Sequence, residues 1–327
     1  MKIAVLDDYA DAFRTVADFS RLDGHEVVSF RDSEKDPARQ AARLGDFDVV
    51  VLMQQRSPFR RAVIEKLPRL KLVVQTGGHR DHLDIEACTE RGIAIARGRS
   101  GKSYSTAELT WGLILSGIRH IPYEVEQMKR GRWQSTVGTE LHGKTLGVYG
   151  LGKIGTVVAH IGAAFGMQVT CWGRSATLAK AQEAGYVVPE SRQAFFESAD
   201  VLTLHIHYLP ETRGIVTAAD LARMKSTALL VNTGRAGLIA EGALVAALRA
   251  GRPGHAAVDV YEDEPVVGGN HPLLGLSNAI CTPHLGYAVR ESYENHYNMV
   301  IANILAFASG HPANIINPEA LGKQPRI

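Results

Sequence analysis

The stretch Leu146-Gly-Val-Tyr-Gly-Leu-Gly-Lys-Ile-Gly155 decides the fold of this chain, because an apolar run enters a Gly-x-Gly-x-x-Gly turn there. An alanine-rich helix is expected to open at Ile154, directly behind the turn. Gly150 permits the tight turn, Gly152 lets the backbone approach a pyrophosphate, and Gly155 lets the helix pack closely on the strand. The amino terminus of the helix offers N–H groups and the positive end of its dipole to the phosphates. This setting predicts a dinucleotide-binding turn.

The alternative is a strand-to-helix turn whose glycines serve packing alone. Three glycines at this spacing also arise by chance in a chain that holds 32 of them. The strand before the turn and the helix behind it favour nucleotide binding over that alternative.

Length and charge restrict the classes of ligand that this chain is expected to bind. At 327 residues it exceeds the size at which a single hydrophobic core keeps growing, which predicts two domains. Its 36 Lys and Arg residues and 34 Asp and Glu residues leave a net charge of +2 without a long run of one sign. Long-range attraction to nucleic acid or to an anionic membrane is therefore weak, and neither is an expected partner. We expect a small-molecule ligand.

The amino-terminal stretch and the cysteines argue against export and against a metal site. Residues 1–8 reach two carboxylates after only four apolar residues, which leaves no signal-peptide core. The apolar run at 109–118 is shorter than the roughly 18 residues of a membrane span, so we expect a cytoplasmic protein. Cys88, Cys171 and Cys281 lie far apart, which implies neither a disulfide framework nor a metal cluster, and no metal is predicted.

Short apolar runs alternate with amphipathic helical patterns along the chain, in two successive series. The first series predicts strands at residues 3–6, 26–30, 49–53, 72–75 and 93–96. The second series starts at Thr145 and predicts further strands at residues 169–172, 201–206, 229–232, 256–260 and 279–282. Strands that alternate with helices form parallel, doubly wound sheets. The predicted fold class is therefore α/β, with two doubly wound parallel-sheet domains.

Three expected helices and one tryptophan bear on how the chain is organised. The helices are expected at residues 58–67, 106–128 and 288–309, the second as a single long helix that bridges the domains. The last helix has no strand series behind it, and packing it on the first series makes that domain discontinuous. We therefore expect one domain over residues 1–99 and 289–327 and the other over residues 100–288. Trp133 lies in a polar loop, where it either packs locally or contacts a partner chain.

Three residues that can carry carbonyl chemistry follow strands of the second series. A nicotinamide enzyme needs a group that binds the substrate, an acid that protonates the developing alkoxide and a partner that tunes the acid. Arg235, Glu264 and His284 supply these types, and ligands of open α/β sheets bind beyond the carboxyl ends of strands. Alternatively, Arg235 caps a helix or pairs with Glu241, Glu264 is one solvated member of an acidic turn, and His284 is a structural histidine.

The order of the motifs resembles one known family over nearly the whole chain. The matching stretches are Gly150-Leu-Gly-Lys-Ile-Gly155, Leu209-Pro-Glu-Thr-Arg-Gly214, Leu221-Ala-Arg-Met-Lys225, Leu230-Val-Asn-Thr-Gly-Arg235, Asp259-Val-Tyr-Glu-Asp-Glu-Pro265 and Thr282-Pro-His-Leu-Gly286. Together they resemble the D-isomer-specific 2-hydroxyacid dehydrogenases, which include glyoxylate and hydroxypyruvate reductases, phosphoglycerate dehydrogenase and formate dehydrogenase. The resemblance implies a flavodoxin-like substrate domain and a Rossmann dinucleotide-binding domain, with the active site in the cleft between them.

The resemblance implies a role for each catalytic candidate. Arg235 is expected to bind the substrate carboxylate and carbonyl, and His284 to donate the proton as hydride leaves the nicotinamide. Glu264 is expected to hold the imidazole, because a carboxylate beside it stabilises the protonated form that carbonyl reduction consumes.

The resemblance also implies substrate contacts in the first domain. Relatives offer backbone N–H groups of a glycine-bearing loop to the substrate carboxylate, and Gly77 and Gly78 stand at that point. Arg56 falls where relatives often place a basic residue of the substrate domain, and a plain solvated arginine is the alternative.

The expected cofactor-binding residues follow strands of the second domain. They are Gly150, Gly152, Lys153, Ile154, Gly155, Arg174, Ser175, Ile206, His207, Thr212, Thr233 and Asp259. By the same resemblance, Asp259 meets the nicotinamide carboxamide. Relatives commonly carry a proline two residues after the counterpart of His205, where this chain has His207.

The end of the second strand of this domain predicts which dinucleotide is bound. NAD-binding units usually carry an acid about 20 residues after the glycines, yet no acidic residue occurs from Thr156 to Gln182. The strand ends instead in Gly173-Arg174-Ser175, and an arginine beside a hydroxyl can bind a 2′-phosphate. We expect a preference for NADP(H) over NAD(H), with a solvated Arg174 and use of both cofactors as the alternative.

These observations predict the reduction of a small 2-oxoacid of glyoxylate or hydroxypyruvate type to the D-2-hydroxyacid, and the reverse oxidation, by a homodimer. The dimer rests on the resemblance and on Trp133. Phosphoglycerate dehydrogenase is the closest alternative; many such enzymes carry a further carboxy-terminal regulatory domain, which this chain is expected to lack. A nucleotide-sensing protein similar to the carboxy-terminal-binding-protein corepressors is the alternative of another class, and poor turnover of 2-oxoacids would identify it.

Overall fold

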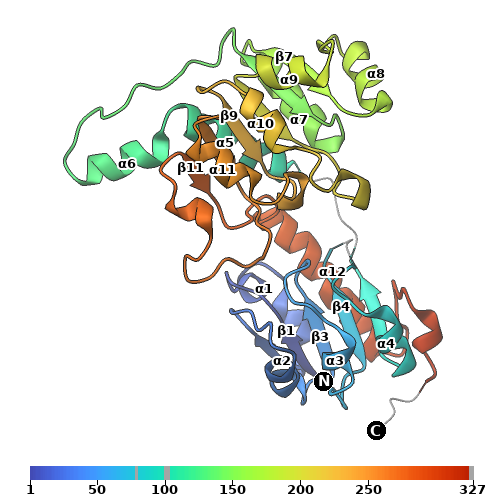
Figure 1. Cartoon of the computed structure of the whole chain (residues 1–327). Coiled ribbons are helices and arrows are strands. Elements are labelled where there is room, and N and C mark those ends of the chain that lie inside the picture. The colour runs from blue at the N-terminus through green and yellow to red at the C-terminus, as the bar shows by residue number, and fades with distance from the viewer. Residues whose placement is uncertain (78–79, 99–103, 324–327) are drawn as a thin grey trace. The chain divides into compact units, whose positions relative to one another are not determined.

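The computed structural model describes residues 1–77, 80–98 and 104–323 (Figure 1). The chain divides into two compact units: unit 1 comprises Met1–Lys102 with Val289–Ile327, and unit 2 comprises Ser103–Ala288. The domain boundary expected between residues 99 and 100 lies outside the described residues. Among those described, no helix combines the length and the apolar character that crossing a membrane requires.

Unit 1 is built on a five-stranded parallel sheet whose strands run in the order β2-β1-β3-β4-β5. The strands are β1 (Lys2–Val5), β2 (Glu26–Ser29), β3 (Val49–Leu52), β4 (Leu72–Gln75) and β5 (Ala94–Arg97). Every residue of β3 and β4 is buried, as expected of parallel strands that are covered on both faces. The strand order is that of flavodoxin, which confirms a flavodoxin-like unit and places its topological switch point between β1 and β3.

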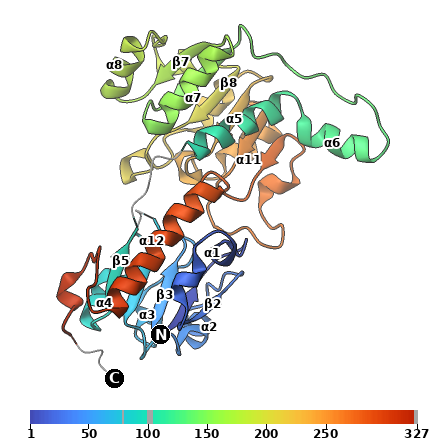
Figure 2. The same cartoon turned by 180° about the vertical axis from the view of Figure 1, so that it is seen from behind.

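Helices cover both faces of the sheet of unit 1. On one face, α2 (Pro37–Leu44), α3 (Arg61–Ile64) and α4 (Ile85–Glu90) bury apolar residues against the strands. On the other face lie α1 (Ala12–Thr15) and the long carboxy-terminal helix α12 (Arg290–Ala308), which runs along the sheet next to β4 (Figure 2). The two ends of the chain therefore build one unit together.

Unit 2 is built on a six-stranded parallel sheet with the strand order β11-β10-β9-β8-β6-β7. The strands are β6 (Thr145–Tyr149), β7 (Gln168–Trp172), β8 (Val201–Leu204), β9 (Leu229–Asn232), β10 (His255–Val258) and β11 (Ala279–Cys281). The chain passes from β6 to β7 on one side and then returns to β8 on the other side of β6. The switch point of this sheet therefore lies between β6 and β8, where open α/β sheets bind their ligands.

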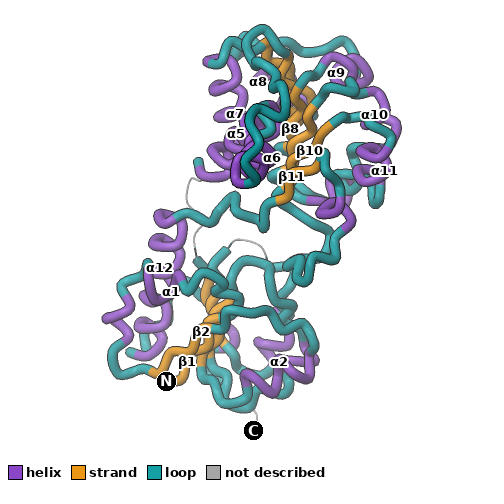
Figure 3. The backbone as a smooth tube through the Cα atoms, turned by 90° about the vertical axis from the view of Figure 1, so that its left-hand side faces the viewer, coloured by secondary structure: helices purple, strands orange, loops and turns teal. Residues whose placement is uncertain are grey.

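Each face of the unit 2 sheet has its own hydrophobic core. Helices α5 (Ser105–Ile118) and α7 (Lys153–Ala164) cover one face, and α9 (Arg192–Ser198), α10 (Ala218–Arg223) and α11 (Ala243–Arg249) cover the other (Figure 3). This arrangement confirms the second doubly wound α/β unit that the strand series predicted.

The single helix expected at residues 106–128 is wrong. The chain forms α5 and a separate helix α6 (Ile121–Lys129), and His120 between them has a φ of 53°. This left-handed conformation ends the hydrogen-bonding ladder of α5, and Pro122 in the first turn of α6 has no N–H with which to continue it. The helix expected at residues 58–67 is also wrong in length, because only the four residues of α3 are helical.

Helix α6 and residues 130–140, here called the arm, expose apolar side chains. Trp133 is 77% exposed and Val137 is 92% exposed. In α6, the side chains of Tyr123 and Met128 are at least half exposed. Local packing of Trp133, one of the two expectations for this residue, is therefore wrong. Exposed apolar side chains gathered on one segment are typical of surfaces that contact another molecule.

Candidate active site

The predicted catalytic and cofactor residues of unit 2 follow different strands of its sheet. Gly150 follows β6, and Arg235 follows β9. Asp259 follows β10, and His284 follows β11. Because all six strands are parallel, these loops leave the sheet at one edge. The structure thus brings to one edge residues that are far apart in the sequence.

The glycine turn has the geometry that a dinucleotide phosphate needs. Gly150 has a φ of 97°, and a Cβ added there would lie 2.8 Å from the carbonyl oxygen of His205. A Cβ added at Gly155 would collide with the carbonyl oxygen of Gly150, so α7 can approach the strand this closely only with glycine there. At Gly152, the N-cap of α7, an added Cβ would meet no described atom within 4 Å. The turn is closed on its protein side and open at the helix N-terminus, which fits a pyrophosphate.

Lys153 and Ile154, also expected at the cofactor, are the first two residues of α7. The backbone N–H groups of a first helical turn have no partner within the helix. These residues can therefore contribute backbone donors to a bound phosphate, and their contact with the cofactor stays a prediction.

His284 and Glu264 form a short ionisable pair at the same edge. Nδ1 of His284 lies 2.6 Å from Oε2 of Glu264, and both side chains are mostly buried. Oε1 of Glu264 accepts a hydrogen bond from the backbone N–H of Tyr261 at 2.9 Å, which holds the carboxylate in place. An ionised carboxylate only accepts hydrogen bonds, so Nδ1 carries a proton and Nε2 is the atom that can exchange one with a substrate. The alternative of a solvated Glu264 is therefore wrong.

Asp259 holds the loop that carries His284. Its Oδ1 accepts hydrogen bonds from the Leu285 N–H at 2.7 Å and from the Thr282 hydroxyl at 2.6 Å. Its Oδ2 accepts from the Gly286 N–H at 2.9 Å. Burial raises the pKa of this carboxyl group, and the three hydrogen bonds act in the opposite direction.

This loop-holding role of Asp259 was missed by the sequence reasoning, which assigned the residue to the nicotinamide carboxamide. The sequence indication for this role was an acid directly after β10, the strand that pairs with β11. The contact between Asp259 and the carboxamide stays a prediction.

The backbone around Arg235 is fixed by the side chain of Asn232. Its amide donates to the carbonyl oxygen of Arg235 at 2.9 Å and accepts from the N–H of Gly234 at 3.0 Å. The hydroxyl of Thr233, an expected cofactor contact, lies 2.8 Å from the hydroxyl of Thr110 in α5. These bonds define the turn that carries Arg235, whose guanidinium donates to the carbonyl oxygen of Gly234 at 2.8 Å.

Arg174 and Ser175 lie at the end of β7, where the 2′-phosphate was predicted to bind. Arg174 is the N-cap of α8 (Ser175–Glu183), and Ser175 is exposed. The guanidinium of Arg174 lies 3.1 Å from Oε1 of Glu211, and both side chains are more than half exposed. This partner is not evident from the sequence, because Glu211 belongs to the loop after β8 (the 3-10 turn η2, Pro210–Thr212).

The loop after β8 carries three further expected cofactor contacts. Ile206 is half-buried and His207 is exposed. Thr212 is buried, and its hydroxyl donates to the carbonyl oxygen of His207 at 2.7 Å. It also accepts from the N–H of Leu209 at 2.8 Å. The Thr212 side chain thus shapes this loop, and its contact with the cofactor stays a prediction.

Two of the expected substrate contacts lie at the carboxyl edge of the unit 1 sheet, and the third, Gly78, lies outside the described residues. Gly77 follows β4, and a Cβ added there would lie 2.5 Å from Oε1 of Gln54. Arg56 follows β3 and is only 8% exposed. The alternative of a plain solvated Arg56 is therefore wrong.

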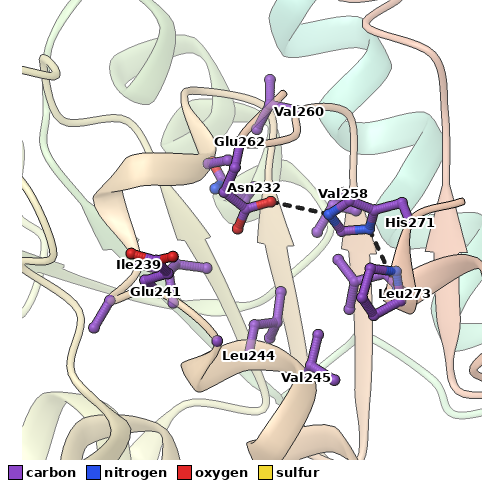
Figure 4. Close-up of a pocket in the computed structure, with 14 residues that line it drawn as sticks. Asn232, Ile239, Glu241, Leu244, Val245, Val258, Val260, Glu262, His271 and Leu273 are labelled. Atoms are coloured by element: carbon purple, nitrogen blue, oxygen red, sulfur yellow. Dashed lines mark hydrogen bonds and ion pairs between the residues drawn. The ribbon is translucent and has the colours of Figure 1, made fainter. Parts of the chain in front are cut away.

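A cavity of about 260 Å³ in unit 2 lies beside the site loops (Figure 4). Asn232 and Ala236 line it on either side of the Arg235 turn. Glu262 and His271, whose Oε2 and Nε2 atoms lie 2.9 Å apart, close it from the loop that contains Glu264. None of the three predicted catalytic residues is among its described lining residues, so we do not place the chemistry in this cavity.

Unit 2 has the fold and the glycine turn of a dinucleotide-binding oxidoreductase. Residues 111–286 match the family model described as D-isomer specific 2-hydroxyacid dehydrogenase, NAD binding domain. The chain therefore belongs to the D-isomer specific 2-hydroxyacid dehydrogenases, as the order of its motifs predicted. Its cofactor is accordingly a nicotinamide dinucleotide.

Relatives with different substrate names are similar to this chain. The glyoxylate reductase of Aeropyrum pernix is 37% identical over 269 residues, which are 79% of this chain and 80% of that protein. The hydroxypyruvate reductase of Blautia hydrogenotrophica is 32% identical over 328 residues, which cover 97% of this chain and 100% of that protein.

Among solved structures, a putative D-3-phosphoglycerate dehydrogenase oxidoreductase from Ralstonia solanacearum is 45% identical, with a TM-score of 0.94 over 99% of this chain and 98% of that one. The chain spans about 55% of the length of the curated D-3-phosphoglycerate dehydrogenase that it matches in Methanocaldococcus jannaschii. These names agree on the family and disagree on the substrate.

Proposed function

We propose that this protein reduces a small 2-oxoacid of glyoxylate or hydroxypyruvate type to the D-2-hydroxyacid with NAD(P)H, and catalyses the reverse oxidation. The observation that carries the proposal is the 2.6 Å pair of His284 and Glu264 on the sheet edge that also holds Arg235 and the glycine turn. A proton donor, its partner, a cation for the substrate carboxylate and a dinucleotide turn are the groups that hydride reduction of a 2-oxoacid requires.

His284 supplies the proton of the reaction. The nicotinamide, when bound, supplies the hydride. Nε2 of His284 donates its proton to the carbonyl oxygen as negative charge develops there, and Glu264 compensates the charge of the imidazolium. Arg235 binds the substrate carboxylate through charge-assisted hydrogen bonds and so orients the carbonyl. In the reverse direction, Nε2 accepts the proton of the 2-hydroxyl group.

Turnover of 2-oxoacids tests this proposal. Glyoxylate, hydroxypyruvate, phosphohydroxypyruvate and a phenyl-substituted 2-oxoacid are assayed with each cofactor. We expect glyoxylate or hydroxypyruvate to give the highest kcat/KM, and R235A and H284A to lower it by about 10²- to 10⁴-fold. Full activity in both variants would contradict the site assignment, and the lack of turnover of all four acids by the wild type would contradict the function.

Phosphoglycerate dehydrogenase is the second candidate, favoured by the name of the similar Ralstonia solanacearum structure. The same assay separates the two candidates, because that enzyme class acts on the phosphorylated acid. A kcat/KM that is highest for phosphohydroxypyruvate would establish the second candidate over the first.

NADP(H) is the cofactor that we propose as preferred, with NAD(H) as a second. The support is the absence of an acid between residues 156 and 182 and the position of Arg174 at the end of β7. An exposed ion pair such as that of Arg174 and Glu211 is worth at most about 1 kcal/mol, so a doubly charged 2′-phosphate can displace the carboxylate. Glu211 nevertheless supplies an acid near the place where NAD-binding units carry one, which supports residual use of NAD(H).

A homodimer is the assembly that we propose. The support is the arm, where Trp133 and Val137 are far more exposed than apolar side chains usually are unless they contact another molecule. A second copy of the chain is the natural partner because most oligomers pair identical surfaces.

A further inference from the structure

The cavity of about 260 Å³ in unit 2 has one polar end and one apolar end. It lies between β10, α11 and the 3-10 turn η4 (Pro272–Gly275). In Figure 4, Asn232, Glu262 and His271 lie above Leu244 and Val245. The apolar part of the wall consists of Ile239, Leu244, Val245, Val258, Val260 and Leu273. Such a wall suits a ligand with an apolar body and a polar head.

The polar end of the cavity is negatively charged. Nδ1 of His271 accepts a hydrogen bond from the N–H of Leu273 at 3.3 Å, so its proton lies on Nε2, which faces Glu262 at 2.9 Å. Glu262 therefore keeps its charge beside a neutral imidazole. Glu241, which is exposed, adds a second carboxylate. No lysine or arginine occurs among the described residues that line the cavity, so this end attracts a cation.

A metal ion fits this end poorly. Calcium and magnesium take about six or more oxygen ligands, and the cavity offers few besides the two carboxylates. The amide of Asn232 is engaged at both of its polar atoms, with the carbonyl oxygen of Arg235 and the N–H of Gly234. A primary ammonium instead needs acceptors for its three N–H donors only, and its carbon chain can pack on the apolar wall. An aliphatic amine is therefore the cation that matches the cavity.

Two residues that line the cavity also support the predicted catalytic residues. Asn232 fixes the backbone turn of Arg235. The ring of His271 lies against the ring of Tyr261, with centroids 5.0 Å apart. The backbone N–H of Tyr261 in turn donates to Oε1 of Glu264 at 2.9 Å. A ligand in the cavity thus contacts groups that hold Arg235 directly and Glu264 through Tyr261.

We propose that this cavity is an effector site that binds a small primary ammonium compound with an aliphatic body. Its volume lies below the roughly 300–1,000 Å³ of pockets for drug-sized ligands, which limits the body to a short chain. The ammonium binds between Glu241 and Glu262, and the chain packs toward Leu244 and Val245. Binding is independent of the proposed function, whereas the effect on turnover rests on it. The bound amine restrains Asn232 and His271, so less ordering of the catalytic loops remains when the 2-oxoacid binds.

Calorimetric titration of 3-methylbutylamine into the full chain at pH 7 tests the binding site. We expect saturable binding with a Kd of about 1 mM or lower. The alcohol of the same shape, 3-methylbutanol, is expected to bind at least about tenfold more weakly, because it lacks the charge that the carboxylates bind. The anion 3-methylbutanoate is expected not to bind. Absence of saturable amine binding, or equal affinity for the alcohol, would overturn the inference.

Two substitutions place the amine in this cavity. V245F fills the apolar end and is expected to abolish binding, while E241Q removes one carboxylate and is expected to weaken binding about threefold. E190Q, at an exposed glutamate of the same unit outside the cavity, is the control and is expected to bind as the wild type does. If V245F does not fold, E241Q remains decisive, because its side chain is exposed. Wild-type affinity in E241Q would overturn the site.

Turnover tests the effector role. With 3-methylbutylamine at about ten times its Kd, kcat/KM for the preferred 2-oxoacid is expected to rise about threefold in the wild type and in E190Q. V245F is expected to show no response. Amine binding without a rise in kcat/KM would overturn the effector role. If the wild type turns over no 2-oxoacid, the proposed function is refuted, and the calorimetric result alone decides whether the cavity binds the amine.

Discussion

Nδ1 of His284 lies 2.6 Å from Oε2 of Glu264, so a short hydrogen bond joins the loop after β11 to the turn after β10. The same turn holds a second pair of the same chemistry, Glu262 with His271 at 2.9 Å (Figure 4). Only the first pair contains a predicted catalytic histidine. The same substitution of glutamate by glutamine can therefore be compared in the two pairs.

Substitution E264Q is expected to lower kcat with the preferred 2-oxoacid by about tenfold or more, since glutamine keeps the shape and removes the charge that stabilises the imidazolium. Substitution E262Q is expected to stay within about twofold of the wild type. Steady-state kinetics in both directions of the reaction measures the effect. Equal losses in the two variants would contradict the role assigned to Glu264.

The pair of Arg174 and Glu211 predicts how cofactor choice responds to substitution. R174A is expected to weaken NADPH binding by about tenfold or more and to leave NADH binding nearly unchanged, because only NADPH has the 2′-phosphate. E211Q is expected to strengthen NADPH binding, because the carboxylate no longer competes for the guanidinium. Fluorescence titration of each cofactor gives the Kd values without turnover.

The matched control for cofactor choice is R223A, which removes another exposed arginine that pairs with a glutamate, Glu197, at 3.2 Å. It is expected to leave both Kd values as they are in the wild type. Equal weakening of the two cofactors by R174A would show that this arginine does not read the 2′-phosphate.

His205 predicts a loss of stability in mild acid. Burial lowers the pKa of this imidazole from 6.5 to about 4, so the unfolded chain binds the proton more tightly than the folded one. The free energy of unfolding therefore has its full value above pH 6.5 and falls as the pH decreases towards 4, by at most about 3 kcal/mol.

Urea unfolding at pH 7 and pH 5 measures this dependence on His205. H205Q keeps a polar partner for Thr203, whose hydroxyl lies 3.0 Å from Nε2, and is expected to flatten the pH dependence. H311Q, at an exposed histidine, is expected to retain it. A pH dependence in H205Q as steep as in the wild type would refute the explanation.

The arm predicts a dimer that two substitutions can separate. W133S with V137S is expected to shift the protein to a monomer in light scattering after size exclusion, because both side chains are mostly exposed in one copy. V267S changes an apolar residue of the same unit that is 70% exposed and lies outside the arm, and it is expected to leave the mass unchanged. A wild-type monomer at micromolar concentration would contradict the proposed dimer.

The sequence was most informative about features that follow from the spacing of apolar residues and from the order of the strands. The strands expected at residues 72–75 and 229–232 have the observed bounds of β4 and β9, because continuous apolar runs flanked by polar residues define buried parallel strands. The predicted site residues of unit 2 lie at one edge of the sheet, because each follows a strand and all strands of this sheet run in one direction.

The sequence was least informative where a residue's partner comes from another loop. The break at His120 depends on a single left-handed residue, which periodicity does not report. The burial of Arg56 and the pairing of Arg174 with Glu211 depend on which loops the sheets place side by side. These contacts are properties of topology, and only the folded chain specifies them.

The completion of unit 1 by α12 has a consequence for the inheritance of substrate choice in this family. Gly77 and Arg56, which are expected to contact the substrate, belong to unit 1, which both ends of the chain build, whereas the residues proposed to transfer the proton belong to the internal unit 2. A recombination between two family genes that exchanges only the 5′ portion would separate the first sheet from its own covering helix. Exchange of either unit as a whole therefore requires two crossovers, one at each boundary of unit 2.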